Sequence, residues 1–280
     1  MKFNRDDYAS FNHYFSQFED ELLKKIRFRS PLTENQQVLE VGSGTGHFAS
    51  LFLTHHCEPC KRIVATDFDP AMMDFARKHF SHEQIVYDTL DITSHSVSDF
   101  LGKYGKFDRI FSFLLFHLVE DQKTAYANVA KLLNDEGECL VLAFSSFDFA
   151  DVWEEVCKTP KWTNRLPNPR TIVNSFFNFH RVKSTAQVEA DVRDALLGTG
   201  LQCISCEVHD HSWKHENMES LLDMLLTVVP FKAIVPAEEW TDFVDLWTQL
   251  LHRKLCPEPG QPLALKFAVY VVHGCRATAQ

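Results

Sequence analysis

The first half of the chain alternates short apolar runs with stretches of helical periodicity, and this alternation constrains the fold more than any other feature. The strand-like runs occupy residues 37–41, 62–67, 84–87, 107–113 and 138–144. Strands separated by helices form βαβ units, whose strands pair in parallel and are covered by helices on both faces. Two more strand-like runs, at 201–213 and 264–273, follow in the second half. We therefore predict an α/β fold with a doubly wound, mostly parallel, seven-stranded sheet.

The alternation stops after Phe144. Residues 145–185 are rich in aromatics and prolines without a clean period, whereas 218–229 and 237–255 have helical spacing. The second of these helices carries an aromatic stripe, which is typical of core packing, with a lipid pocket or a dimer surface as the alternatives. We expect one domain over 1–280 with a helical cap over a substrate pocket. The core is expected at about 36–144, 187–213 and 262–275, and the cap at 1–30, 145–186 and 214–258.

Charge and apolar patterning limit the partners and the location. The chain has 28 Lys and Arg against 38 Asp and Glu, a net charge of −10, so a polyanion such as nucleic acid is a poor partner. The N-terminus lacks the apolar segment of a secretory signal, and the longest apolar stretch, 110–119, is shorter than the ~20 residues of a membrane helix. We therefore expect a cytoplasmic protein with no membrane span, a monomer or homodimer with reduced cysteines.

A glycine-rich loop follows the first strand and is the most informative segment. It reads Glu40-Val-Gly-Ser-Gly-Thr-Gly46, and its third glycine arrives one position earlier than in a dinucleotide fingerprint, where His47 stands. This form, with an acid before the first glycine, resembles motif I of class I S-adenosylmethionine-dependent methyltransferases. Glycines let the backbone approach a ligand closely, and turn amides beside a helix N-terminus favour the methionine carboxylate. Glu40 can act on the ligand's amino group, directly or through water.

Two acids downstream stand at the ends of the next strands. Asp67 closes the second strand, where a carboxylate can accept both ribose hydroxyls. Asp91-Ile92 follows the third strand, where an acid and an apolar neighbour can hold the adenine amino group and ring face. Either Asp could instead cap a helix. Taken together with the glycine loop, they predict S-adenosyl-L-methionine as the cofactor.

The exit of the fourth strand should also face the ligand, because ligands of such sheets bind at the carboxyl ends of the strands. Phe111, Phe113 and Phe116 are candidates for lining the methyl-donor side, since aromatic faces accommodate a sulfonium cation, although some of them must pack in the sheet. The predicted cofactor-binding residues are Glu40, Gly42, Ser43, Gly44, Gly46, Asp67, Phe68, Asp91, Ile92, Ser112 and Phe113.

A narrower resemblance rests on four further segments. They are Tyr8 to Asn12, His117 with Glu120-Asp121-Gln122, Leu132 to Gly137, and Pro230-Phe231 with Ile234 and Pro236. In these segments, in length and in layout, the chain resembles the juvenile hormone acid O-methyltransferases, most weakly over 145–185. The resemblance implies methyl transfer to the carboxylate of a sesquiterpenoid acid, such as farnesoic acid or juvenile hormone acid, to give a methyl ester.

The resemblance also implies a set of substrate contacts, from which this chain departs at two positions. The family usually places Trp directly after the motif histidine and Gln in the N-terminal helix, and here those positions hold Leu118 and Phe15, with Gln17 nearby. The candidate substrate-binding residues are Tyr14, Phe15, Gln17, Phe116, His117, Leu118 and Trp153. Because both departures lie at the substrate end, a related enzyme with a different small-molecule acid is the alternative, and the cofactor assignment is unaffected.

A carboxylate acceptor determines what catalysis requires. Its pKa of about 4–5 leaves it ionised at neutral pH, so attack on a sulfonium methyl group needs no strong general base. Positioning and exclusion of water, worth up to ~7–11 kcal/mol in ideal cases, are then the main sources of catalysis. We therefore predict no catalytic acid or base, and His117 either donates a hydrogen bond to the substrate carboxylate or caps a turn.

Three other functions stay open on the sequence. A hydroxyl or amine acceptor needs a base, for which His117 and Glu120 are the candidates. An NAD-dependent oxidoreductase gives no role to Asp91. A non-catalytic lipid-binding relative explains Leu118 and Phe15, which stand where the family has polar contacts.

Two Cys-x-x-Cys pairs invite a zinc interpretation, which we reject. The pairs Cys57/Cys60 and Cys203/Cys206 are far apart in the sequence, unlike those of a zinc ribbon. The second pair lies in a strand pattern, where residues i and i+3 point to opposite faces and cannot share one ion. We predict no metal site.

Overall fold

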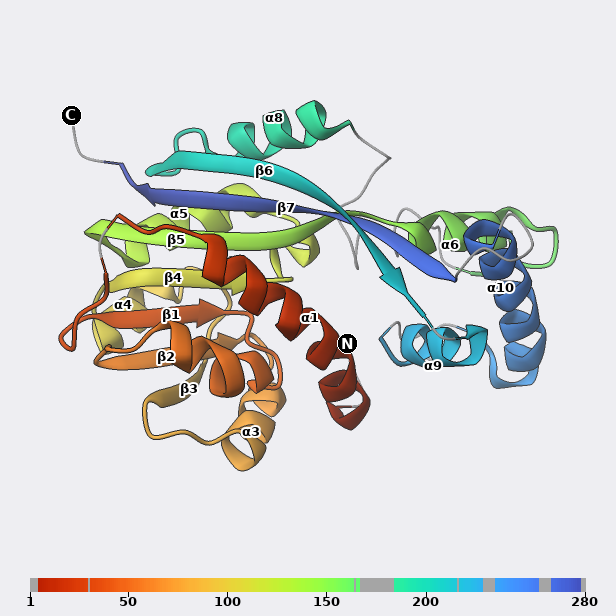
Figure 1. The fold of residues 1–280 in the computed structure, drawn as a ribbon, viewed down its shortest axis with the longest axis horizontal. Helices are drawn as coiled ribbons and strands as arrows, with labels where there is room; N and C mark the ends of the chain where they lie inside the picture. The colour runs from red at the N-terminus through yellow and green to blue at the C-terminus, as the bar shows by residue number, and fades with distance from the viewer. Residues whose placement is uncertain are drawn as a thin grey trace.

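The computed structural model describes residues 5–29, 31–163, 165–166, 184–215, 217–228, 235–256 and 263–277. The side chains of 5–14, 149–150, 224 and 227–228 lie outside that description. One sheet with helices on both faces forms the main body, and a smaller helical lobe stands at one end of it (Figure 1).

The sheet confirms the predicted seven-stranded, mostly parallel arrangement. Its strands are β1 (Gln37–Val41), β2 (Arg62–Asp67), β3 (Ile85–Thr89), β4 (Phe107–Phe113), β5 (Leu133–Phe147), β6 (Leu201–Lys214) and β7 (Ala264–Arg276). Their order is β3-β2-β1-β4-β5-β7-β6, with β7 antiparallel to both of its neighbours. The chain winds to one side from β1 and to the other from β4. Ligands of such sheets bind beyond the carboxyl ends of the strands at that switch point.

The helices agree with the periodicity of the sequence except at two places. They are α1 (Arg5–Lys25), a π-helical turn η1 (Ala49–Leu53), α2 (Thr54–His56), α3 (Pro70–His79), α4 (Val97–Tyr104), η2 (Phe116–Leu118), α5 (Gln122–Leu132), α6 (Asp148–Lys158), α8 (Thr185–Leu196), α9 (Met218–Val228), η4 (Ala237–Glu239) and α10 (Trp240–Leu255). The sequence does not predict α4, which at eight residues is too short to establish a period. It does not predict α6 either, because β5 continues to Phe147 and the helix begins at the next residue.

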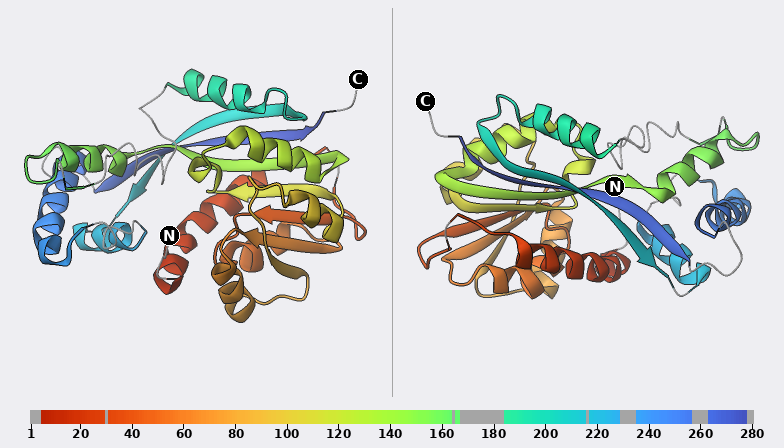
Figure 2. Two further views of the ribbon diagram at one scale, coloured as in Figure 1. Left: turned by 180° about the vertical axis from the view of Figure 1, so that it is seen from behind. Right: turned by 45° about the horizontal axis from the view of Figure 1, so that its top comes forward.

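Alternate residues of the strands enter two separate cores. In β1, Val38 packs with Ile63 beneath α1 and α3, whereas Leu39 packs with Val64 beneath α4 and α5. All five residues of β1 are buried, as expected for a parallel strand covered on both faces. The two views in Figure 2 show these helical layers on opposite sides of the sheet.

The smaller lobe forms around the far ends of β6 and β7, which are longer than β1 to β4 and extend beyond them (Figure 2). It contains α6, α9 and α10. Trp153 of α6 packs against Phe243 and Trp247 of α10, with ring centroids 5.9 and 6.0 Å apart. All three side chains are buried, so the aromatic stripe of α10 packs as the core of this lobe.

The segment that follows α1 is fixed to the sheet by a buried charge network. Glu138 of β5 lies 3.3 Å from Arg109 of β4 and 2.8 Å from His273 of β7. The backbone N–H of Arg29 donates to the same carboxylate at 3.0 Å, and the Phe28 ring lies against the Arg109 guanidinium. The C-terminal end of α1 is therefore anchored across the middle of the sheet.

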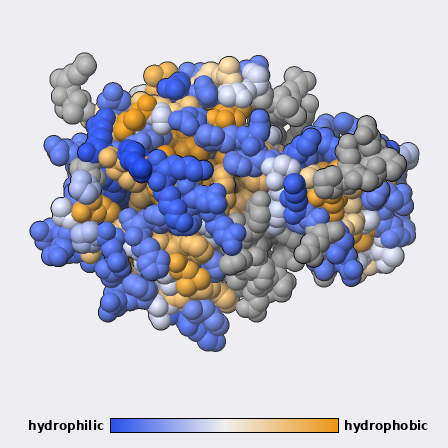
Figure 3. Space-filling view, in the orientation of Figure 1, coloured by the Kyte–Doolittle hydropathy of each residue, from blue (hydrophilic) through white to orange (hydrophobic). Residues whose placement is uncertain are grey.

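The face of the molecule seen in the orientation of Figure 1 is more hydrophilic than apolar. Figure 3 shows a mostly hydrophilic face, on which hydrophobic residues gather in small patches. Among the helices that the structure describes, none combines the length and the apolar character that crossing a bilayer requires.

Candidate cofactor and substrate site

The glycine loop turns sharply at the carboxyl end of β1, beside the switch point. Gly42, Gly44 and Gly46 have φ angles of 82°, 54° and 77°, in the left-handed region that favours glycine. The N–H groups of Gly42 and Ser43 donate to the Thr66 carbonyl of β2 at 2.7 and 2.8 Å. The loop is therefore tied to β2 as it leaves β1.

Close packing also excludes side chains from two of these positions. A Cβ atom at Gly42 would come within 2.8 Å of Leu115, which follows β4. One at Gly46 would come within 2.8 Å of both Ala76 on α3 and Tyr87 on β3. Contacts that short would force the neighbouring residues to move. The loop can therefore pack closely against the exit of β4, α3 and β3 only with glycine at both positions.

Asp67 stands at the end of β2 and supports the loop. One of its oxygens accepts a hydrogen bond from the Gly44 N–H at 3.1 Å, and the other accepts from the Asp69 N–H at 3.0 Å. The side chain is 9% exposed. Burial raises the pKa of Asp67, and the two backbone donors oppose that change. A carboxylate has about four acceptor sites, so both oxygens of Asp67 can still accept a further hydrogen bond.

Glu40, the acid before the first glycine, is 2% exposed, and its Oε2 atom has no hydrogen-bond partner among the described residues. Burial, and after it the charge of Asp67, raises the pKa of Glu40 to about 8. Without a ligand, this carboxyl therefore holds its proton most of the time at pH 7. A cation bound beside it would favour the ionised form.

A second buried acid, Glu19 on α1, was missed by the sequence reasoning. It is 5% exposed, and burial, followed by the charge of Glu40, raises its pKa well above the ordinary value. A signal for it exists in the sequence: Glu19 is four residues after Phe15 and three before Leu22, at the helical spacing that places all three on the apolar stripe of α1. An acid on an apolar stripe is expected to be buried, functional or both.

The three candidates that follow β2 and β3 lie in different environments. Phe68 is 64% exposed just beyond β2. Asp91 is exposed, and its Oδ1 atom accepts from the N–H and the hydroxyl of Thr93 at 2.8 and 2.7 Å, which is the turn-capping arrangement. Ile92 is buried, and its carbonyl accepts from the Asn128 side chain at 2.7 Å. The second oxygen of Asp91 and the Phe68 ring remain accessible to a ligand.

The exit of β4 lies against the glycine loop. Ser112 is buried, and its hydroxyl donates to the Val41 carbonyl at 2.9 Å. Phe113 packs against Phe48, with ring centroids 5.1 Å apart. Leu114 has a φ angle of 52°, an unfavourable value for a residue with a side chain. Such backbone strain is commonly found at functional sites.

The three residues of η2 that were candidates for substrate contact point in different directions. His117 is buried, with its ring 5.0 Å from that of Phe144, and burial lowers its pKa to about 3, so it is neutral at pH 7. Phe116 packs on Tyr126 of α5, in the core on the opposite face of the sheet. Leu118 is 42% exposed. Only His117 of the three adjoins the aromatic cluster described next.

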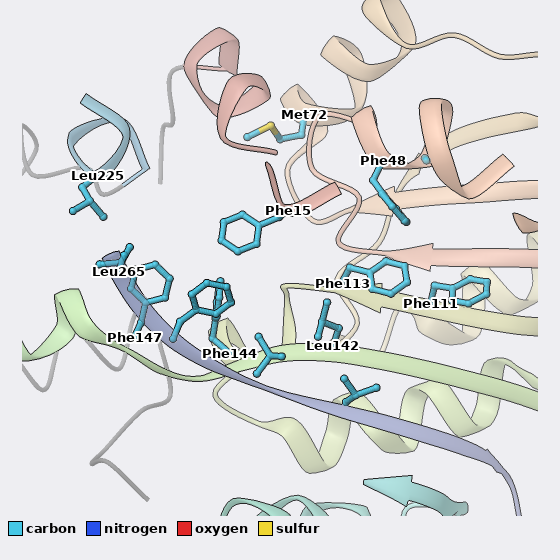
Figure 4. Close-up of a cluster of buried hydrophobic side chains, with 14 of the residues drawn as sticks. Phe15, Phe48, Met72, Phe111, Phe113, Leu142, Phe144, Phe147, Leu225 and Leu265 are labelled. Carbon is cyan, nitrogen blue, oxygen red and sulfur yellow. The ribbon is translucent and has the colours of Figure 1, made fainter. Parts of the chain in front are cut away.

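The aromatic cluster joins α1, β5, β6 and β7 between the main body and the smaller lobe. Phe15 lies edge-on to Phe144, Phe267 and Trp213, with ring centroids 5.4, 5.8 and 5.6 Å apart. Phe147 extends it from Phe144 at 5.1 Å. Figure 4 shows Phe15 reaching from α1 toward Phe144 and Phe147, with Phe113 farther along the same apolar layer. The cluster leads from the exit of β4 toward the smaller lobe.

The remaining substrate candidates lie apart from the cluster or outside the described side chains. Gln17 is exposed, because two residues along a helix is a rotation of about 200° from Phe15. Trp153 has its ring partners in the smaller lobe. The side chain of Tyr14 is among those that are not described.

Comparison with known sequences identifies similar methyltransferases. A family profile described as a methyltransferase domain matches residues 39–139, from β1 to β5. The juvenile hormone acid O-methyltransferase of Bombyx mori is 22% identical over 241 residues, which cover 84% of this chain and 83% of that protein. The juvenile hormone acid O-methyltransferase of Drosophila melanogaster is 25% identical, over 81% of this chain and 73% of that one. The predicted resemblance is therefore confirmed.

Comparison with solved structures identifies the same fold. A Bacillus halodurans protein classed as a methyltransferase superposes with a TM-score of 0.57 at 17% identity, over 93% of this chain and 99% of that one. The Haemonchus contortus phosphoethanolamine N-methyltransferase 2, solved with S-adenosyl-L-methionine, superposes with a TM-score of 0.50 at 13% identity, over 93% of this chain and 52% of that one. The fold is the Rossmann-like fold of class I methyltransferases, as the sequence predicts.

Proposed function

We propose that this class I, S-adenosylmethionine-dependent methyltransferase, which resembles the juvenile hormone acid O-methyltransferases, methylates the carboxylate of a hydrophobic acid. Sesquiterpenoid acids such as farnesoic acid and juvenile hormone acid are the first candidates. The two similar enzymes from Bombyx mori and Drosophila melanogaster, matched over most of both chains, support this choice.

The residues at the switch point fit the cofactor. S-adenosylmethionine, when bound, supplies an electrophilic methyl group on a sulfonium centre. Glu40 has a buried oxygen with no hydrogen-bond partner in the described part of the chain, which suits the ammonium group of the methionine half. Asp67 would hold the ribose hydroxyls with its remaining acceptor sites, and Asp91 the adenine amino group with its free oxygen. The Phe68 ring, exposed beyond β2, can cover an adjacent flat group.

The aromatic cluster is the observation that carries the choice of acceptor. A carboxylate placed at His117 would have its apolar chain directed along Phe144 and Phe15. Burial of an apolar chain there yields about 0.8 kcal/mol per CH₂ group, so a long acid binds better than a short one. A preference for longer chains is the behaviour expected of a site for a hydrophobic acid.

The residues of the chain would position the acceptor and exclude water rather than move a proton. The acceptor carboxylate is already ionised at neutral pH. His117 is neutral and can donate one hydrogen bond to it without competing for the proton. The surrounding rings displace water, which strengthens that hydrogen bond and leaves the nucleophilic oxygen less solvated.

A methyl-transfer assay with labelled S-adenosylmethionine tests the proposal. Farnesoic acid, juvenile hormone acid and a twelve-carbon fatty acid are compared with acetic acid and with farnesol, which has the same chain and a hydroxyl in place of the carboxyl group. We expect labelled methyl esters from the long acids and none from farnesol. Binding of the donor is measured in parallel by calorimetry.

Each outcome of the assay has a distinct meaning. Donor binding without transfer to any acid refutes carboxyl methylation and favours a lipid-binding relative. Transfer to farnesol at the rate seen for farnesoic acid refutes the claim that no base is needed, and makes His117 or Glu120 a candidate base. Absence of donor binding removes the cofactor assignment altogether.

A further inference from the structure

Three buried carboxyl groups surround the glycine loop, and none of them has a cationic partner among the described residues. Glu19, Glu40 and Asp67 are 5%, 2% and 9% exposed and come from α1, β1 and β2. Within the described part of the chain, no lysine, arginine or histidine lies within ion-pair distance of any of them. Burying acids without a partner is costly. Buried acids with raised pKa values cluster at functional sites, where a ligand can bring the opposite charge.

Two contacts hold Glu19 against this region of the molecule. The Ser16 hydroxyl lies 3.1 Å from Nδ1 of His47, the residue after the glycine loop, and Asp20 lies 2.6 Å from His56 on α2. Ser16, Glu19 and Asp20 are spaced i, i+3 and i+4, so they share one face of α1. That face therefore packs against the loop region, and Figure 1 shows α1 beside the carboxyl end of β1.

Two buried polar atoms of the loop region find no partner within the described ranges, which points to a ligand as their partner. The Oε2 atom of Glu40 and the hydroxyl of Ser43 are both buried without a hydrogen bond among the described residues. Buried polar groups in folded proteins almost always have partners, so two such atoms on residues three positions apart require an explanation. The charge of Glu40 also reaches Glu19, whose pKa it raises beyond the effect of burial.

The arrangement of these acids suits an organic ammonium group better than a metal ion. Among the described residues, no group of three or more His, Cys, Asp or Glu side chains is arranged to hold a metal ion. An ammonium group needs only a few oxygen acceptors, and two carboxyl groups from different elements can supply them. The amides of the adjacent bend suit the carboxylate that an amino acid carries beside its ammonium group.

We propose that Glu19 of α1 and Glu40 of β1 together bind the α-ammonium group of the methionine half of S-adenosylmethionine, so that the N-terminal helix forms one wall of the cofactor site. This inference rests on the proposed function, because it assigns a second contact within the same site. It makes α1 part of the donor site at Glu19 and part of the aromatic cluster at Phe15, four residues earlier.

The substitution Glu19→Gln tests the inference by calorimetry on the full chain with two ligands. S-adenosylhomocysteine carries the α-ammonium group, whereas 5′-methylthioadenosine retains the adenosine and lacks the amino acid. A charge-assisted hydrogen bond is worth roughly a 10- to 100-fold change in affinity. We expect that loss for S-adenosylhomocysteine and no change for 5′-methylthioadenosine. Glu21→Gln, the same change at an exposed position of the same helix, should alter neither affinity.

The two ligands separate the possible failures. Wild-type affinity of Glu19→Gln for S-adenosylhomocysteine overturns the inference and leaves the proposed function intact. An equal loss for both ligands also overturns it, because Glu19 then supports the shape of the loop rather than the ammonium group. If the wild-type protein binds neither ligand, the proposed function itself fails. Retained binding of 5′-methylthioadenosine by Glu19→Gln shows that the variant is folded.

Discussion

Replacement of Glu40 by Gln should stabilise the cofactor-free protein, and by more at high pH than at low pH. Burial raises the pKa of Glu40 from the ordinary 4.5 to about 8. A carboxyl whose pKa is raised on folding favours the folded state fully below about pH 4.5, and that contribution is lost as the pH rises through about 8. At about 1.36 kcal/mol per pH unit, the difference amounts to about 5 kcal/mol, of which roughly 3 kcal/mol is already lost at pH 7.

Glutamine has the same shape and does not ionise, so the stability of the variant does not fall as the pH rises through this range. We expect the difference in unfolding free energy between Glu40→Gln and wild type to grow by about 3 kcal/mol from pH 5 to pH 8. Urea unfolding at pH 5, 6.5 and 8 without cofactor measures it. The charge that acts on Glu40 is that of Asp67 on β2. Glu40 in turn raises the pKa values of three neighbouring groups, Glu19, Tyr87 and Cys57. Burial raises the pKa values of Tyr87 and Cys57, so neither ionises in this range.

A flat difference between the two proteins across that pH range would refute the reasoning. It would mean that Glu40 ionises in the folded protein as readily as in the unfolded chain, and that water or another group solvates its carboxylate. The exposed Glu21→Gln variant is the matched control, since the same loss of a carboxyl on the surface should leave the pH dependence of stability unchanged. Saturating S-adenosylmethionine should reverse the sign, because the ionised Glu40 then has a cationic partner.

Three further changes test the fold and the acceptor site. Gly46→Ala should lower the free energy of unfolding in urea by about 2–5 kcal/mol, because of left-handed backbone strain and a Cβ contact of 2.8 Å. Gly102→Ala, on α4 with open space around it, should raise that free energy by about 0.5–1 kcal/mol. Equal effects of the two substitutions would contradict the packing argument. Phe15→Leu should raise the KM for a long acid roughly fivefold, because apolar contact is lost, and should leave the affinity for the donor unchanged. Phe100→Leu, in the core on the opposite face of the sheet, is its control. An unchanged KM in Phe15→Leu would exclude Phe15 from the acceptor site. Glu138→Gln should cost about 3–5 kcal/mol because it removes the buried carboxylate that pairs with Arg109, and a thermal midpoint equal to wild type would show that the ion pair contributes nothing.

The candidate site could be predicted where it depends on backbone spacing. The glycine loop, Asp67 and Asp91 follow strands whose boundaries are set by local periodicity, and parallel strands bring their carboxyl ends to one edge. The spacing could not show that Asp67 also supports Gly44, because that hydrogen bond joins two segments more than twenty residues apart. It could not show that Asp91 uses one oxygen to cap its own turn.

The direction of each side chain determines which of the candidate substrate-binding residues lie at the aromatic cluster. Phe116, His117 and Leu118 are consecutive, and a single 3₁₀ turn directs them to the opposite core, to the aromatic cluster and to the surface. No periodicity can be read from three residues, so the sequence could not separate them. In the same way, Gln17 was a candidate by its chemistry, and the rotation of α1 places it on the exposed face.

The sequence by itself determined the seven-stranded α/β sheet, the loop of three glycines and the order of the acids along it, because strand and helix periods and glycine φ preferences are local properties. The tertiary structure decided that α1 lies against the loop, that Glu19 joins Glu40 there, and that Phe15 meets Phe144 and Trp213. Those contacts connect segments as many as about two hundred residues apart, and burial, which raises the pKa of Glu40 and Glu19, is a property of what packs around a residue rather than of its neighbours along the chain.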